Sequence, residues 1–167
     1  MKKSRFLAYG ALIAALYVAL TYLQNALLPG SATWAIQFRA SEALCVLALF
    51  TPAAIPGLTL GCLLFNISYA GALPLDFLVG SLATLLATAG MYALRKMTVK
   101  GYPLLAMLLP AVTNAFLVGW ELSVYIGGAF WLNALYVVIG ELAVLVTLGT
   151  VLYYAMRNRG LDKRLFG

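Results

Sequence analysis

Long apolar segments alternate with short polar or turn-forming stretches along almost the whole chain. Six of these segments are predicted to be helices, at about residues 5–24, 38–50, 56–70, 75–94, 103–126 and 130–156. About 20 helical residues cross a bilayer core of roughly 30 Å, so the second segment is short for a full span. The pattern predicts an all-α integral membrane protein, a bundle of six transmembrane helices that forms one domain over residues 1–167.

Prolines and glycines mark several of the predicted helix ends. Pro52 and Pro56 fall between the second and third segments, where they break any helix. Pro103 stands at the first turn of the fifth segment, a position that proline favours. Gly127 and Gly128 separate the fifth segment from the sixth. Six crossings would return both termini to the same side of the membrane.

Composition and charge agree with this topology. Hydrophobic residues make up 64% of the chain and charged residues 10%, against roughly 25% charged residues in soluble domains. Ten of the 11 Lys and Arg residues fall near the two termini or in the loop at 95–100. Because Lys and Arg accumulate in cytoplasmic loops, we expect cytoplasmic N- and C-termini in a multi-pass protein of the plasma membrane. The net charge of +6 is then a topology signal and does not indicate nucleic-acid binding.

Five ionisable residues lie in or at the edge of the apolar segments. They are Arg39, Glu42, Asp76, Glu121 and Glu141. Each costs about 2.5 to 3.5 kcal/mol to place in a bilayer, so each needs a partner or a function. The topology puts all five toward the outer side, together with three amides, Asn66, Asn114 and Asn133. These residues predict a polar cavity that opens to the outside.

The charged residues near the predicted helix starts have structural alternatives. Arg39 and Glu42 are three residues apart, so on a helix they either pair with each other or stand at the rim of a ligand pocket. Asp76 follows Pro74 at a helix start. A carboxylate there interacts favourably with the first N–H groups, so we expect Asp76 to cap its helix.

The two deeper carboxylates are harder to explain by structure alone. Asn114, Glu121 and Tyr125 share one helical stripe, which forms either the wall of a pocket or an interhelical hydrogen-bond network. Glu141 has no basic residue nearby in sequence. Either it is protonated or a cationic or donor-rich group meets it.

Aromatic and small residues form two further patterns. Trp34, Tyr125 and Trp131 fall near the outer interface, where aromatic residues are common anchors, and together they also suit stacking on a flat ring. Small residues at spacings of three and four recur in the first and third segments, at Ala8, Ala11, Ala15, Ala19, Gly57 and Gly61. Such stripes allow close helix packing, either within the bundle or against another membrane protein.

The residue inventory excludes several kinds of chemistry. The chain has no histidine, and Cys45 and Cys62 lie in apolar segments, where cysteines behave as buried hydrophobes. We find no nucleotide-binding loop, serine nucleophile motif or metal cluster, so we expect no enzyme, no metal and no cofactor in this chain. An outward cavity without an energy source predicts a solute-binding membrane subunit that other proteins drive.

Two other classes of protein remain as alternatives. The first is a self-sufficient secondary transporter or channel that uses the buried carboxylates as a proton or ion relay. No clear inverted repeat relates the two halves, which argues against it. The second is an intramembrane enzyme with Glu121 and Glu141 as an acid and base pair, but the chain lacks a nucleophile or metal motif.

Several blocks of sequence resemble one transporter family. Residues 36–44 read IQFRASEAL, residues 49–57 read LFTPAAIPG, and Gly61 and Cys62 follow. Further matches are Leu75-Asp76, residues 80–86, residues 112–115 with Val118-Gly119, residues 130–131 with 134–136, and Gly140-Glu141. These blocks spread over nearly the whole chain. They are similar to the signature of the QueT family of queuosine-precursor transporters.

The resemblance implies a substrate-binding S component of an energy-coupling factor (ECF) transporter. Such subunits have six membrane helices and capture a micronutrient from outside. They associate with a transmembrane coupling subunit and two ATPases, which use the ATP. The resemblance also implies that Ala11, Ala15 and Ala19 contact the coupling subunit, and that the ligand is a 7-deazaguanine base or queuine.

The chemistry of such a ligand suits the polar residues of the chain. A guanine edge offers adjacent N–H donors that a carboxylate accepts in pairs. We therefore expect Glu121 or Glu141 to bind this edge or a ligand amine, and Asn66 and Asn114 to contact the ring. One aromatic would stack on the ring, and Arg39 with Glu42 would close the site. The candidate binding residues are Glu121, Glu141, Asn114, Arg39, Glu42, Asn66, Trp34, Tyr125 and Trp131.

Overall fold

The computed structural model describes residues 2–31 and 38–166, and the regular elements of this part of the chain are helices. Each of the six segments predicted from the sequence overlaps one helical rod, and α5, η2 and α6 form the last rod together. The elements are α1 (Lys3–Leu27), the 3₁₀ helix η1 (Ala40–Leu49), α2 (Ala54–Ser68), α3 (Asp76–Leu94), α4 (Leu104–Tyr125), α5 (Phe130–Val144), the π-helical turn η2 (Leu145–Gly149), α6 (Thr150–Asn158) and α7 (Leu161–Phe166).

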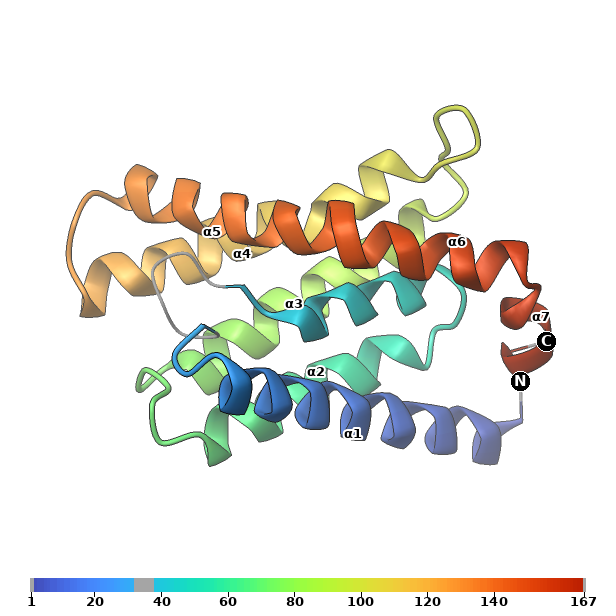
Figure 1. Cartoon of the computed structure of the whole chain (residues 1–167), viewed down its shortest axis with the longest axis horizontal. Coiled ribbons are helices and arrows are strands. Elements are labelled where there is room, and N and C mark those ends of the chain that lie inside the picture. The colour runs from blue at the N-terminus through green and yellow to red at the C-terminus, as the bar shows by residue number, and fades with distance from the viewer. Residues whose placement is uncertain (1, 32–37, 167) are drawn as a thin grey trace.

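The rods run side by side along the long axis of the molecule, with α1 and α7 meeting at one end (Figure 1). There the ring of Tyr9 packs edge-to-face on Phe166, with 5.2 Å between centroids. Four rods are long and apolar enough to cross a membrane: Lys3–Leu27, Asp76–Leu94, Leu104–Tyr125 and Phe130–Asn158. The chain is therefore an all-helical membrane protein with four candidate spans, while η1 and α2 are shorter apolar helices.

The short helix η1 lies at the centre of the bundle. It contacts α1, α2, α3, α4, α5, η2 and α6, and eight of its ten residues are buried. A 3₁₀ helix rises about 2.0 Å per residue, so η1 reaches roughly 20 Å, further than an α-helix of the same length. A short element is tolerated at membrane depth where protein surrounds it.

Glycines allow α2 to pack closely against α1. A Cβ atom added to Gly57 would lie 2.6 Å from the carbonyl oxygen of Gly10, and one added to Gly61 would lie 2.7 Å from the Cβ of Tyr17. The small-residue pattern on α2 therefore serves packing inside the bundle. The alanine stripe behaves differently, because Ala8, Ala11, Ala15 and Ala19 are all exposed.

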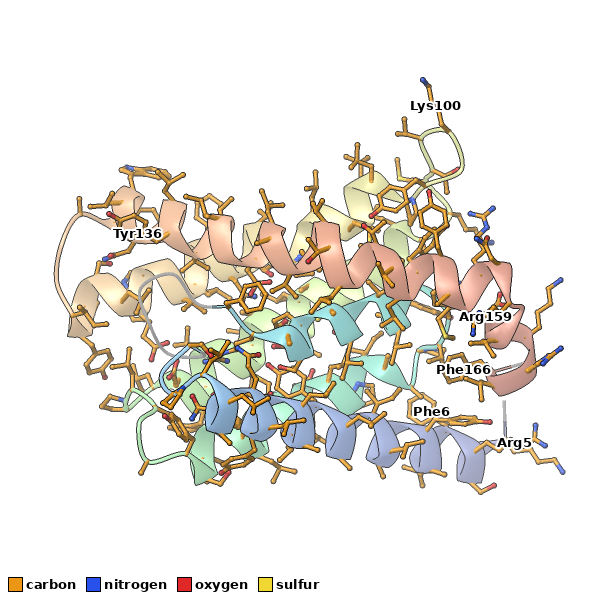
Figure 2. The ribbon with its side chains drawn as sticks, in the orientation of Figure 1. Arg5, Phe6, Lys100, Tyr136, Arg159 and Phe166 are labelled. Carbon is orange, nitrogen blue, oxygen red and sulfur yellow. The ribbon has the colours of Figure 1, made fainter. Side chains whose placement is uncertain are left out.

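The surface of the molecule is apolar along its length and basic at one end. Leu7, Val151 and Trp131 are 69%, 69% and 73% exposed, as expected where lipid surrounds the bundle. Arg5 and Arg159 lie at the end that also holds α7, and Lys100 stands on a projecting loop toward the same end (Figure 2). The buried polar residues described next lie toward the other end.

Candidate functional site

Polar side chains gather inside the bundle, away from its basic end. They come from the start of η1 and of α3, the last turn of α2, the middle and end of α4, and both ends of α5. All of them are buried: Arg39, Glu42, Asn66, Asp76, Asn114, Glu121, Asn133 and Glu141. Within the described residues the site is thus enclosed by packed helices, whereas the sequence predicted an open polar cavity.

Arg39 lies at the centre of this polar cluster. Its guanidinium is within electrostatic range of Glu42 and Asp76, and it also acts on Glu121 and Glu141. The Cζ atom stands 5.9 Å from the ring centroid of Phe65. The positive charge of this guanidinium thus acts on four carboxyl groups, one each on η1, α3, α4 and α5.

Glu42 joins η1 to the first helix. Its Oε1 accepts a hydrogen bond of 2.5 Å from the Tyr17 hydroxyl, and its Oε2 accepts one of 3.2 Å from the Cys45 thiol. Both carboxylate oxygens are thus used within the protein, so Glu42 holds the site together more than it offers acceptors to a ligand. Cys45 and Cys62 are both buried free thiols.

Two further α1 residues that the sequence analysis did not single out support η1 in the same way. Thr21 donates from Oγ1 to the Ser41 hydroxyl at 2.7 Å. Gln24 accepts at Oε1 from the backbone N–H of Ala40 at 2.6 Å. With Tyr17 they form a polar stripe at spacings of four and three on the buried face of α1. A polar stripe in an otherwise apolar segment is therefore the sequence pattern that could have identified these residues.

The deep carboxylates leave acceptor atoms without hydrogen-bond partners. Asn114 donates from Nδ2 to Oε1 of Glu141 at 2.7 Å, so the amide positions this carboxylate. Glu141 Oε2 and Oδ1 of Asn66 are buried with no partner among the described atoms, and the two oxygens of Glu121, which find no donor there, lie against the Asp76 carboxyl group. Unpaired buried polar atoms are rare in proteins. All four here are acceptors, so the site suits a ligand that is rich in donors.

Asp76 and Asn66 link α2 to the start of α3. Asn66 donates from Nδ2 to the backbone carbonyl of Asp76 at 2.8 Å, and Asp76 Oδ2 accepts from the N–H of Leu73 at 3.0 Å. Asp76 is the first residue of α3, so its carboxylate lies at the helix start as predicted, but no side-chain hydrogen bond caps the helix. The carboxylate instead binds the turn ahead of the helix, at the N–H of Leu73.

A pocket of 450 Å³ lies beside Asn66. It is lined by the end of α2, the following turn and the start of α3, including Tyr69, Leu73 and Phe77. Tyr69 stacks on Phe65 with 5.2 Å between centroids and 14° between ring planes. This partly exposed tyrosine offers a flat surface next to an unpaired amide oxygen, and the sequence analysis did not identify it.

The structure does not bring the predicted stacking residues into the cluster. Tyr125 is 41% exposed because it is the last residue of α4. At this end of the helix the stripe that Tyr125 shares with Asn114 and Glu121 is no longer covered by neighbouring helices. Trp131 packs edge-to-face on Phe130 and Phe116 at the outside of the bundle. Trp34 lies outside the described residues.

The fold and the site define a class of protein: a helical membrane protein that encloses a charged, polar site near one end, as solute carriers and their binding subunits do. A family model described as QueT transporter matches residues 7–158. The chain therefore belongs to the QueT transporter family and is a membrane transport protein. Searches among curated proteins and among solved structures found no significant match.

Proposed function

We propose that this chain is the substrate-binding S component of an ECF-type importer in the plasma membrane. It captures a queuosine precursor, a 7-deazaguanine base or queuine, from outside the cell. A transmembrane coupling subunit and two ATPases complete the importer, and ATP hydrolysis in these partners drives uptake. Membership of the QueT transporter family supports this proposal.

The arrangement of charge supports an outward-facing site. With the basic end in the cytoplasm, as the distribution of Lys and Arg favours, the cluster of carboxylates lies toward the outside. The four long helices, together with η1 and α2 as short inner crossings, then give six passes and cytoplasmic termini. Glu121 lies about 6 Å along α4 from the outer end of that helix, at 1.5 Å per residue.

The observation that carries the proposal is the set of unpaired buried acceptors. A 7-deazaguanine presents N–H donors along its amidine edge, and such donors suit the neighbouring carboxyl groups of Glu121 and Asp76. Leaving such acceptors unpaired costs about 1–3 kcal/mol each, so a ligand that satisfies them gains affinity. Asn66, with its free Oδ1 beside the pocket, offers one more acceptor.

Calorimetry on the purified protein tests this function. We expect micromolar or tighter binding of 7-deazaguanine bases, and weaker binding for both Glu121→Gln and Glu141→Gln. Asp162→Asn is the matched control, because it neutralises a carboxylate on α7 at the other end of the molecule. Full affinity in both glutamine variants would rule out the assigned pocket.

The alanine stripe is the proposed contact with the coupling subunit. Ala11 and Ala15 are exposed on the side of α1 opposite its buried face, where small residues allow another helix to approach closely. Ala11→Trp and Ala15→Trp should abolish co-purification with the coupling subunit and leave ligand binding intact. Leu135→Trp, an exposed position on α5, serves as the control. Retained co-purification in both alanine variants would exclude this interface.

A self-sufficient transporter is the second candidate, because buried carboxylates around one arginine also suit a proton or ion relay. Reconstitution in liposomes without ATPases separates the two functions. Uptake that depends on a proton gradient alone would favour the self-sufficient transporter. Uptake that requires the coupling subunit and ATP would favour the S component.

A further inference from the structure

An apolar groove lies at the surface of the bundle, between α4 and the rod formed by α5, η2 and α6. Its volume is 370 Å³. Met107 and Leu145 line it and are only 3% and 2% exposed, so they form its floor, while Leu104 and Val146 are exposed at its sides. Its lining shares no residue with the buried polar cluster described above. The groove therefore opens toward the lipid around the bundle and is a separate feature of the molecule.

One end of this groove is polar. Tyr102 and Tyr154 line it there, with their rings stacked and 6.1 Å between centroids. Thr150 donates from Oγ1 to the carbonyl of Leu145 at 3.2 Å, across the π-helical turn η2. The Tyr102 hydroxyl lies 2.8 Å from the same Oγ1 and donates to it, because the threonine proton is already used. A π-helical turn is rare and often marks a functional site.

A tight turn places a lysine at this polar end. Val99 and Tyr102 each donate a backbone N–H to the carbonyl of the other, at 2.8 and 3.0 Å. Between them, Lys100 and Gly101 have φ angles of 51° and 79°. Lysine rarely adopts such a φ, and a strained residue that a fold retains points to a function. The turn makes the exposed Lys100 project from the loop between α3 and α4 (Figure 2).

An arginine of α6 reaches the same turn. Arg157 donates from Nη1 to the carbonyl of Gly101 at 2.6 Å and to the hydroxyl of Tyr153 at 2.5 Å. Both hydrogen bonds use Nη1, so the N–H groups of Nε and Nη2 are left for another acceptor. Asp162 is the one acidic residue in the parts of the sequence that hold the ten basic residues outside the polar cluster. The positive charge beside the groove therefore suits an anionic partner.

We propose that the groove binds one anionic phospholipid, with an acyl chain in the groove and the phosphate at Lys100 and Arg157. Basic sites between membrane helices bind anionic headgroups in this way, and arginine binds phosphate with two parallel N–H groups. A helix from a partner protein fits the groove less well. One helical turn about 10 Å across occupies roughly 400 Å³, so 370 Å³ holds only about one turn, whereas a single acyl chain is narrow enough to enter.

Native mass spectrometry of the detergent-purified protein tests this site. The probes are phosphatidylglycerol, which is anionic, and phosphatidylcholine, which has no net charge, with the same acyl chains and at equal concentration. Each basic residue beside the phosphate contributes about fivefold in affinity, so we expect the wild-type protein to prefer phosphatidylglycerol about 25-fold.

Two charge variants locate the headgroup. Lys100→Asn removes the ammonium and keeps the turn, because asparagine tolerates a positive φ. The preference for phosphatidylglycerol should then fall about fivefold, while the melting temperature without added lipid should not fall. Arg5→Gln is the matched control, because it removes a basic residue at the same end of the molecule, on α1 (Figure 2). This control should keep the full preference.

A third variant tests the acyl chain. Val146→Trp fills the groove and should weaken binding of both lipids about tenfold or more, as for an overpacked site. Val151→Trp is its control, because Val151 is 69% exposed, close to the 66% of Val146, and does not line the groove. The control should bind both lipids as the wild-type protein does.

The outcomes that would overturn the proposal are distinct. Equal wild-type binding of the two lipids would exclude an anionic site. An equal loss of preference in Arg5→Gln and Lys100→Asn would show general attraction to the basic end and no defined site. Full lipid binding by Val146→Trp would exclude the groove as the place of the acyl chain. If that variant also failed to co-purify with the coupling subunit, the groove would be a protein interface.

Discussion

Replacing Gly57 with alanine tests how closely α1 and α2 must pack. The added Cβ would lie 2.6 Å from the carbonyl oxygen of Gly10 and 3.2 Å from its Cα. Comfortable contacts between such atoms are about 3.5 Å, and both neighbours are backbone atoms that cannot rotate away. The two helices must therefore separate by about 1 Å at this point.

The expected effect follows from this overlap. Overpacking of this kind costs about 1–3 kcal/mol, which lowers the melting temperature of a protein of this size by about 2 to 12 °C. Thermal unfolding of the detergent-purified protein, followed by its tryptophan fluorescence, measures the change. Gly57→Ala should lower the midpoint of thermal unfolding and leave the transition cooperative.

Gly10→Ala is the matched control on the facing helix. A Cβ there meets its nearest neighbour, the carbonyl oxygen of Ala53, at 3.5 Å, an ordinary contact. Because alanine favours a helix over glycine by up to about 1 kcal/mol, this variant should melt at or above the wild-type temperature. If Gly57→Ala also melts at or above the wild-type temperature, the fold does not require the close contact between α1 and α2.

Three further predictions concern the site and the topology. Tyr17→Phe removes the donor to Glu42 and should destabilise the protein by about 1–3 kcal/mol in thermal unfolding; an unchanged midpoint would contradict this. Asn114→Ala should weaken binding of a 7-deazaguanine base about tenfold in calorimetry, because its carboxylate partner is no longer held in place, and unchanged affinity would exclude that positioning role. In whole cells, a membrane-impermeant thiol reagent should label Ala129→Cys and not Lys96→Cys, since the native cysteines are buried; the reverse pattern would invert the topology.

The helices could be predicted because their signals are local. Apolar runs broken by Pro and Gly mark the rods, and α4 begins at Leu104, directly after Pro103. The 3₁₀ form of η1 is different, because it depends on how the surrounding helices pack around Ala40–Leu49. Nothing in those ten residues alone distinguishes a 3₁₀ helix from a short α-helix. The short helix α7 was also not anticipated.

The partners within the site could not be predicted from spacing. Asn114 and Glu121 share a stripe of α4, yet the amide of Asn114 binds Glu141 on α5. Spacing along one helix gives the direction of a side chain, but the facing helix decides which group it meets. For the same reason the sequence analysis did not single out Tyr17, whose hydroxyl donates to Glu42 on η1.

The central position of η1 has a consequence for biogenesis. The four long helices are apolar enough to enter the bilayer one at a time, as membrane insertion requires. The ten residues of η1 are short for inserting on their own, and Glu42 would be costly there until the Tyr17 hydroxyl of α1 donates to its carboxylate. Membrane insertion of the long helices and assembly of the buried polar cluster are therefore separate events, and the chain completes this cluster when η1 packs among the other helices.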